Sequence, residues 1–294
     1  MKIKGADPVI FVNTTRAPAT RHANKEVCPL FLLLLCLVPA IAAADTAPLP
    51  VIAIIMDDIG YRHREDQEVI ALPGPLAVSI LPYSPHADEM ARLAAGAGKD
   101  VMLHLPMEPL QGEKNVALGP GALMLGMDRV GLMRTLNQNL RSVPTAIGVN
   151  NHMGSLLTRD TEHMQWLMES LRIHGKFFVD SLTGHNSVAA DVAQRKGVPN
   201  LRRDVFLDDD LGAQNLQDNF QELISVARRK GSALAIGHPH PETIALLRAR
   251  LPQLEQMGVR LVSVPQLLQM RGESMETRTA GLGNGGAAPG ARLQ

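Results

Sequence analysis

Side chains able to do metal and acid–base chemistry follow several short apolar runs of this sequence. The pair Asp57 and Asp58 comes first; the others are Asn151 with His152, His104, Asp180 and His238. One carboxylate and two imidazoles make a three-ligand site with an open position, the usual arrangement for catalytic zinc. Adjacent carboxylates can divide the work, one binding metal and one accepting a proton, because successive strand residues point in different directions. A lone Asp at a strand end is more often a turn former or helix cap, so the prediction depends on several such residues coinciding.

These residues converge only if the apolar runs are neighbouring parallel strands. Apolar runs alternate with longer amphipathic stretches, which is typical of parallel strands covered by helices. The expected strands are 51–56, 76–81, 100–105, 146–150, 176–180, 200–205, 232–237 and 260–264. The expected helices are 85–97, 128–141, 161–174, 189–197, 215–230 and 241–258. This rhythm can close as a (β/α) barrel or remain an open sheet, and in both cases the strand C-termini emerge on one face.

Composition and absent motifs exclude several functional classes. The 29 Lys and Arg residues balance 29 Asp and Glu residues, without a long basic run, so no nucleic-acid partner is expected. No Gly-rich dinucleotide fingerprint or Walker-type loop follows the first apolar run, which weighs against a nucleotide-dependent enzyme. A G-x-S-x-G elbow, as in serine hydrolases, is also absent.

The two ends of the chain differ from the middle. Residues 1–44 have the basic leader, short apolar core and small terminal residues of a signal peptide, with an uncleaved anchor as the alternative. Cys28 and Cys36 fall inside this segment, so the mature chain has no cysteine and no disulfide. Residues 273–294, rich in Gly and Ala, predict a disordered tail. We therefore expect one domain at 45–272, exported to the periplasm, with no stable membrane span after cleavage.

Several segments resemble the divergent polysaccharide deacetylases, a branch of the polysaccharide deacetylase superfamily. They are IAIIMDDIG at 52–60, LAVSILPYSPHA at 76–87, VMLHLPMEP at 101–109, IGVNNHMGS at 147–155, FFVDSLT at 177–183 and AIGHPHPET at 235–243. The segments follow one another through most of the mature chain. The resemblance implies an α/β fold, a distorted (β/α)7-type barrel with parallel strands.

The resemblance also implies a role for each polar residue. Asp57 matches the catalytic base, and His238 matches the general acid, with Asp180 in the place of the carboxylate that orients it. The implied metal ligands are Asp58, His104 and His152. The reaction would be hydrolysis of an N- or O-acetyl group on a carbohydrate, with Asp57 taking a proton from water and His238 protonating the leaving group. Zinc is the expected cofactor, although cobalt, nickel or manganese fits the same ligands.

Some features depart from the superfamily. The usual H-x-x-x-H segment has Glu108 at its second position here, which leaves Glu108 as a spare ligand or substrate contact. No Arg-x-Pro-Tyr segment is present to hold the base, and only 3% of residues are aromatic. Tyr61, Tyr83 and Asn151 are the remaining candidate substrate contacts.

Two functions are compatible with these residues. The first is an exported metal-dependent deacetylase acting on an envelope carbohydrate such as peptidoglycan or an exopolysaccharide. The alternative is a metal- or glycan-binding envelope protein with little turnover, acting through cell-wall remodelling partners. A complete set of acidic and His residues favours the enzyme, whereas the scarcity of aromatic residues favours the binding protein.

Overall fold

A computed structural model describes residues 48–111 and 118–272 of the chain. The predicted signal peptide and the predicted C-terminal tail lie outside these ranges. In the part of the chain that is described, no helix combines the length and apolar character needed to cross a bilayer.

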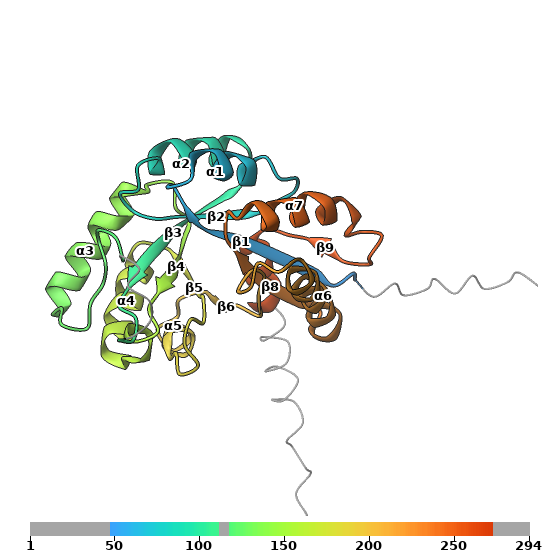
Figure 1. Ribbon diagram of the computed structural model, residues 1–294. Helices are drawn as coiled ribbons and strands as arrows, with labels where there is room; N and C mark the ends of the chain where they lie inside the picture. The colour runs from blue at the N-terminus through green and yellow to red at the C-terminus, as the bar shows by residue number, and fades with distance from the viewer. Residues whose placement is uncertain (1–47, 112–117, 273–294) are drawn as a thin grey trace, which may run out of the picture. The chain divides into compact units, whose positions relative to one another are not determined.

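A curled parallel sheet of nine strands forms the centre of the described residues (Figure 1). The strands are β1 (Val51–Ile59), β2 (Ala77–Ile80), β3 (Asp100–Met107), β4 (Gly148–Met153), β5 (Phe177–Asp180), β6 (Asn200–Arg202), β7 (Val205–Phe206), β8 (Ser232–Gly237) and β9 (Arg260–Leu261). Their order is β6-β5-β4-β3-β2-β1-β8-β7, and β9 pairs with the first residues of β1. The predicted fold class, a distorted parallel (β/α) barrel, is confirmed.

The two ends of this strand order lie next to each other in the chain. Only Arg203 and Asp204 separate β6 from β7, and the two strands do not pair. The backbone N–H of Arg203 donates to the carbonyl of Asp180 on β5, and that of Asp204 donates to Leu234 on β8. These two residues therefore connect the two edges of the sheet, and the single strand predicted at 200–205 is split in two.

Helices surround the outside of the curled sheet (Figure 1). They are α1 (His63–Ile70), α2 (Ala87–Gly96), α3 (Arg129–Ser142), α4 (Thr161–Ile173), α5 (Ala189–Arg195), α6 (Ala213–Lys230) and α7 (Pro241–Arg250), with short 3-10 turns η2 (Leu157–Arg159) and η3 (Leu251–Gln253). A further helix, at 264–272, packs against the apolar cluster inside the curl. Asp128 and Asp160 cap α3 and α4 by accepting hydrogen bonds from the backbone of the first turn. The helix predicted at 241–258 ends at Arg250, because Pro252 has no N–H to continue the helical hydrogen bonds.

Alternate residues of β1 face two different apolar layers, which explains its unbroken apolar sequence. Ile52, Ile54 and Met56 pack into the outer layer with the helices. Val51, Ala53 and Ile55 belong to a second cluster inside the curl, together with Leu234, Ile236, Val262, Val264 and Leu267. The interior is thus filled with apolar side chains beside the first residues of β1, and polar side chains begin where β1 reaches Asp57.

Candidate metal centre and active site

The end of β1 directs its two adjacent carboxylates to different partners. The pairing register between β1 and β2 shifts between Met56 and Ile59, as in a β-bulge. Asp58 adopts a φ of 59°, in the left-handed region that Asp tolerates better than most residues. Asp57 is 1% exposed, whereas the side chain of Asp58 is 36% exposed. The sequence therefore places two carboxylates side by side in the chain and in two different environments.

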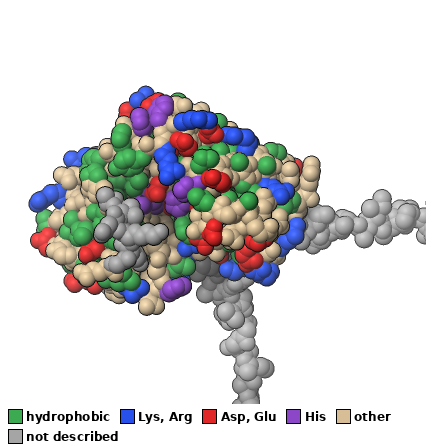
Figure 2. All heavy atoms as spheres, in the orientation of Figure 1, with side chains coloured by type: hydrophobic (Ala, Val, Ile, Leu, Met, Phe, Trp, Pro, Cys, Tyr) green, Lys and Arg blue, Asp and Glu red, His purple; other side chains and the backbone are tan. Residues whose placement is uncertain are grey.

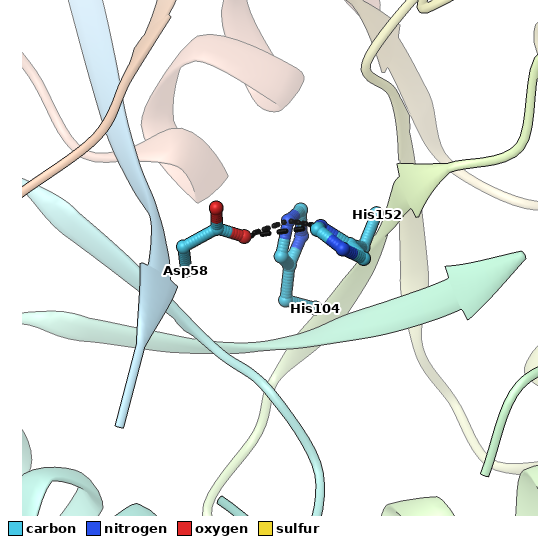
Figure 3. Close-up of side chains that lie close together, drawn as sticks. All are labelled: Asp58, His104 and His152. Atoms are coloured by element: carbon cyan, nitrogen blue, oxygen red, sulfur yellow. Dashed lines mark hydrogen bonds and ion pairs between the residues drawn. The ribbon is translucent and has the colours of Figure 1, made fainter. Parts of the chain in front are cut away.

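Asp58 converges with two histidines from the neighbouring strands β3 and β4 (Figure 3). Asp58 Oδ1 lies 3.2 Å from His104 Nε2 and 3.0 Å from His152 Nδ1, and the two ring nitrogens are 3.1 Å apart. Donor atoms bound to one tetrahedral zinc at 2.0–2.1 Å lie about 3.3 Å from one another. Asp58 Oδ1 is buried and has no well-formed hydrogen bond with any described residue. Three converging donors with one orphaned oxygen fit a divalent cation.

The charge state of Asp58 suits a metal ligand. Burial would raise the pKa of its carboxyl, but the nearby rings of His104 and His152 outweigh burial and hold the pKa below its usual range. A lowered pKa favours the ionised carboxylate at neutral pH. An ionised carboxylate and neutral imidazoles are the forms that bind zinc.

Asn150 links the candidate metal cluster, formed by Asp58, His104 and His152, to Asp57. Its side-chain Nδ2 donates to both carboxylate oxygens of Asp57, at 2.9 and 3.1 Å, so its Oδ1 is left to accept hydrogen bonds. Ser79 Oγ donates to this Oδ1, and His104 Nδ1 lies 3.1 Å from it. His104 Nδ1 therefore donates to Asn150, and in the neutral form of the ring the lone pair of Nε2 is free for a metal ion. Asn150 is a residue that the sequence analysis missed.

Asp57 is placed to act as a proton acceptor. Its burial raises the pKa of the carboxyl, while the charges of His104 and His238 and the hydrogen bonds from Asn150 oppose this rise. His104 Nε2 lies 3.7 Å from Asp57 Oδ2, so Asp57 adjoins the metal cluster without being one of its three converging donors. A carboxylate whose pKa is raised towards neutrality is a stronger base than an exposed one.

His238 follows β8 and is held by Asp208. The His238 Nδ1 atom lies 2.9 Å from Asp208 Oδ1, and the His238 backbone N–H donates to Asp208 Oδ2 at 2.6 Å. Thr243 Oγ1 also donates to Asp208 Oδ2. Burial alone would lower the pKa of His238, but Asp208 and, more weakly, Asp58 and Asp57 raise it to about 9. His238 Nε2 is 4.0 Å from Asp58 Oδ2, so a protonated imidazole borders the metal cluster.

The prediction that Asp180 orients His238 is wrong. Asp180 ends β5, which lies five positions from β8 in the strand order, whereas Asp208 follows β7, the partner of β8. Asp180 instead accepts hydrogen bonds from Leu182 N at 2.9 Å and Ser187 Oγ at 2.8 Å, so it holds the loop after β5.

The fold and site were compared with known proteins. The profile of the divergent polysaccharide deacetylases matches residues 54–268. The chain belongs to the divergent polysaccharide deacetylase family. It is 39% identical over 217 residues to protein YibQ of Escherichia coli K12, covering 74% of this chain and 67% of that protein. A Haemophilus influenzae protein is 40% identical over 216 residues, covering 74% and 76%. The crystal structure of ATU2773 from Agrobacterium tumefaciens aligns with a TM-score of 0.71 and 22% identity, covering 76% of this chain and 90% of that one.

In this member of the family, a cavity of about 510 Å³ opens beside the Asp58, His104 and His152 cluster. Asp57, His152 and His238 line it, and the loops after β4 and β5 and residues at the β6–β7 split complete it. Arg203 also lines this cavity and carries a positive charge. Its guanidinium donates to the carbonyls of Ser181 and Leu182 at 2.6 and 2.9 Å. It also lies 4.6 Å from the centre of the Phe206 ring. A fixed positive charge therefore borders the cavity, and the sequence analysis did not identify it.

The four residues predicted to contact substrate occupy different places around the candidate active site. Asn151 is buried, lines the large cavity and supports the loops, since its Oδ1 accepts from Ser181 N. Tyr61 is 50% exposed and lines a second cavity of about 270 Å³ that His152 also borders. Tyr83 is 46% exposed and approaches Gly121, where an added Cβ would lie 3.0 Å from the ring. Glu108 is not among the three converging donors. Its carboxylate instead accepts a hydrogen bond from the backbone N–H of Leu125.

Proposed function

We propose that this protein is an exported, metal-dependent hydrolase that removes N- or O-linked acetyl groups from an envelope carbohydrate such as peptidoglycan or an exopolysaccharide. The observation that carries the proposal is that two proton-handling groups adjoin the Asp58, His104 and His152 cluster and line one cavity with its two histidines. Asp57, whose pKa is raised by burial, lies 3.7 Å from His104 Nε2, and His238, which is held by Asp208, lies 4.0 Å from Asp58 Oδ2. Membership of the deacetylase family supports the same reaction.

The metal would be held by Asp58, His104 and His152, with zinc favoured by the mixed imidazole and carboxylate ligands. When bound, a divalent cation lowers the pKa of coordinated water to about 7 and polarises a carbonyl oxygen. Asn150 fixes the tautomer of His104 through the 3.1 Å contact at Nδ1, so the Nε2 lone pair is available to the ion. The three donor spacings, 3.0 to 3.2 Å, are close to the value of about 3.3 Å expected around a tetrahedral zinc.

Proton transfer is assigned to the two flanking groups. Asp57 accepts a proton from the attacking water, and the amide of Asn150 keeps its carboxylate oriented during this step. His238 carries a proton at neutral pH because its pKa is about 9, and it donates this proton to the departing sugar nitrogen or oxygen. The bond between the acetyl carbon and that atom breaks, which yields acetate and a free amine or hydroxyl. Base and acid are therefore separate residues with their pKa values displaced from the ordinary ones.

The two cavities around His152 support a polymeric substrate. The larger one holds Asp57 and His238, and the smaller one has an apolar lining of Leu81, Pro82, Pro106 and Pro120 with Tyr61 at its side. Sugars present apolar faces and hydroxyl edges, so we assign the large cavity to the reacting unit and the Tyr61 cavity to its neighbour. The predicted signal peptide would deliver the protein to the periplasm, where acetylated glycans of the envelope are found.

The proposal is tested by acetate release from a panel of acetylated glycans, including peptidoglycan fragments and acetylated exopolysaccharide. The full chain is measured as purified, after chelation, and after zinc is restored. We expect release that chelation abolishes and zinc restores, and that is absent from the Asp57→Asn variant although this variant binds zinc. Zinc binding without acetate release from any glycan would contradict the enzyme and favour the alternative of a metal- or glycan-binding envelope protein.

A further inference from the structure

A second group of metal-binding side chains lies outside the active site, where α1 and α2 begin. His63 is the first residue of α1, His86 immediately precedes α2, and Glu89 is in the first turn of α2. Their ligand atoms all lie within 4.8 Å of one another. Histidine side chains gather at the surface over these helices, at the top of the view in Figure 2.

The Glu89 carboxylate is shared between the two imidazoles. Glu89 Oε1 lies 3.1 Å from His63 Nε2, and Oε2 lies 3.7 Å from His86 Nδ1. The centres of the two imidazole rings are 4.7 Å apart. Two imidazoles and one carboxylate are a common set of three protein ligands for zinc, with the remaining position left for water. The side chains are 36% to 45% exposed and can therefore rotate. Small rotations can shorten the 3.7 Å distance between His86 Nδ1 and Glu89 Oε2 to the spacing of about 3.3 Å that zinc requires.

Several carboxylates lie near this cluster, and one of them, Asp88, is paired with Arg92 at 2.9 Å. The first turn of α1 contains Glu65 and Asp66, and that of α2 contains Asp88 in addition to Glu89. Asp66 is fully buried, and its Oδ1 has no hydrogen-bond partner among the described residues. Burial raises the pKa of Asp66, and a positive charge on His86 acts against that rise. A cation held by His86 would stabilise the Asp66 carboxylate in the same way.

We propose that His63, His86 and Glu89 form a second site for a divalent transition metal, with zinc as the reference ion. The site joins α1 to α2 next to the loop that follows the end of β1. His86 N donates to the carbonyl of Gly60, and Gly60 N donates to Asp66 Oδ2 at 2.9 Å. Metal binding at the surface would therefore stabilise the segment that begins two residues after Asp58. This inference does not depend on the proposed deacetylase activity.

The proposal is tested by counting zinc ions bound to the full chain by calorimetric titration. We expect two ions per chain for the wild type and one for His63→Ala/His86→Ala. The matched control is His174→Ala, which removes a surface histidine elsewhere, bonded to Asn137, and should leave the count at two. In the Asp58→Asn/His152→Ala variant, which lacks two of the three inner ligands, zinc at one hundred times its Kd should still raise Tm by about 5 °C.

The possible outcomes separate the two metal sites. Equal zinc counts for the wild type and His63→Ala/His86→Ala would overturn the second site, whatever happens to the first. One ion lost only in the Asp58→Asn/His152→Ala variant would also overturn it while supporting the active-site metal. Loss confined to the His63→Ala/His86→Ala variant would support the second site and count against the proposed active-site metal. Circular dichroism of each variant confirms that it is folded.

Discussion

The imidazole of His238 should lose its raised pKa when Asp208 is replaced by Asn. In the wild type, burial favours the neutral ring, but the carboxylate 2.9 Å from Nδ1 outweighs burial and raises the pKa to about 9. Compared with the ordinary value of 6.5, this is a factor of about 300 in proton affinity, or about 3 kcal/mol. Asp208→Asn keeps an acceptor oxygen and removes the charge. We therefore expect the pKa of His238 to fall to about 6.5 or below.

The assay is an NMR titration of the histidine Cε1 protons in metal-free protein, with the His238 signal assigned by its loss in His238→Gln. Asp180→Asn is the matched control, because Asp180 holds the Ser187 loop and makes no contact with His238 in the structure. An unchanged His238 pKa in Asp208→Asn would refute the reasoning. An equal fall in both variants would refute the assignment to Asp208 in particular.

The same pair makes stability depend on pH in a defined direction. A folded-state pKa of about 9 above an unfolded value near 6.5 stabilises the protein fully below pH 6.5, and this contribution is lost as pH rises through 9. The free energy of unfolding of Asp208→Asn should fall below that of the wild type by about 3 kcal/mol at pH 6, and the gap should narrow at pH 10. Urea unfolding at the two pH values measures it, and an equal gap at both would contradict the account.

Three further predictions concern other parts of the site and fold. Asp57→Asn should bind zinc like the wild type and lower kcat at least about 100-fold, measured by acetate release; wild-type kcat would exclude this base. Asn150→Ala should lower zinc affinity about 10- to 100-fold, by competition with a chelator, because it frees the ring of His104; unchanged affinity would contradict this role. Asp204 is paired with Arg271 at 2.7 Å; burial would raise its pKa, but this pairing lowers it. Asp204→Asn should therefore cost about 2 kcal/mol at pH 7, and thermal unfolding should show this loss beginning to shrink below pH 3.8 and vanishing once pH is below the lowered pKa of Asp204; a loss that does not shrink with acidification would refute the pairing.

Most of the fold could be predicted because its strands are continuous apolar runs. β1 is apolar on both sides because it separates two apolar layers, so its sequence shows a strand plainly. α1 was missed because its sequence, HREDQEVI, buries only Asp66, Val69 and Ile70 and therefore lacks a clear apolar stripe. The sequence predicts one continuous strand at 200–205, whereas the structure has two. The split cannot be seen in the sequence, because it depends on hydrogen bonds from Arg203 and Asp204 to two different strands.

The candidate site was predictable where its residues stand at strand ends. Asp58, His104 and His152 were identified in this way, and the structure brings them together. Asp208 lies in a run of three acidic residues, which resembles an exposed turn, and only the pairing of β7 with β8 brings it to His238. Asn150 lies within β4, and an amide at such a position does not by itself indicate a functional site. Its role is visible only when its hydrogen bonds to Asp57 and His104 are known. Sequence therefore indicated the ligands but not the residues that orient them.

The central claim is that Asp58, His104 and His152 hold a divalent metal that the protein needs to release acetate. The most direct test measures zinc content by elemental mass spectrometry and acetate release on the same samples. It uses the His63→Ala/His86→Ala chain, so that the proposed surface site does not contribute, with and without His152→Ala. We predict about one zinc per chain with acetate release, and loss of both when His152 is replaced. Equal zinc content in the two samples, or acetate release that survives the loss of zinc, would contradict the account.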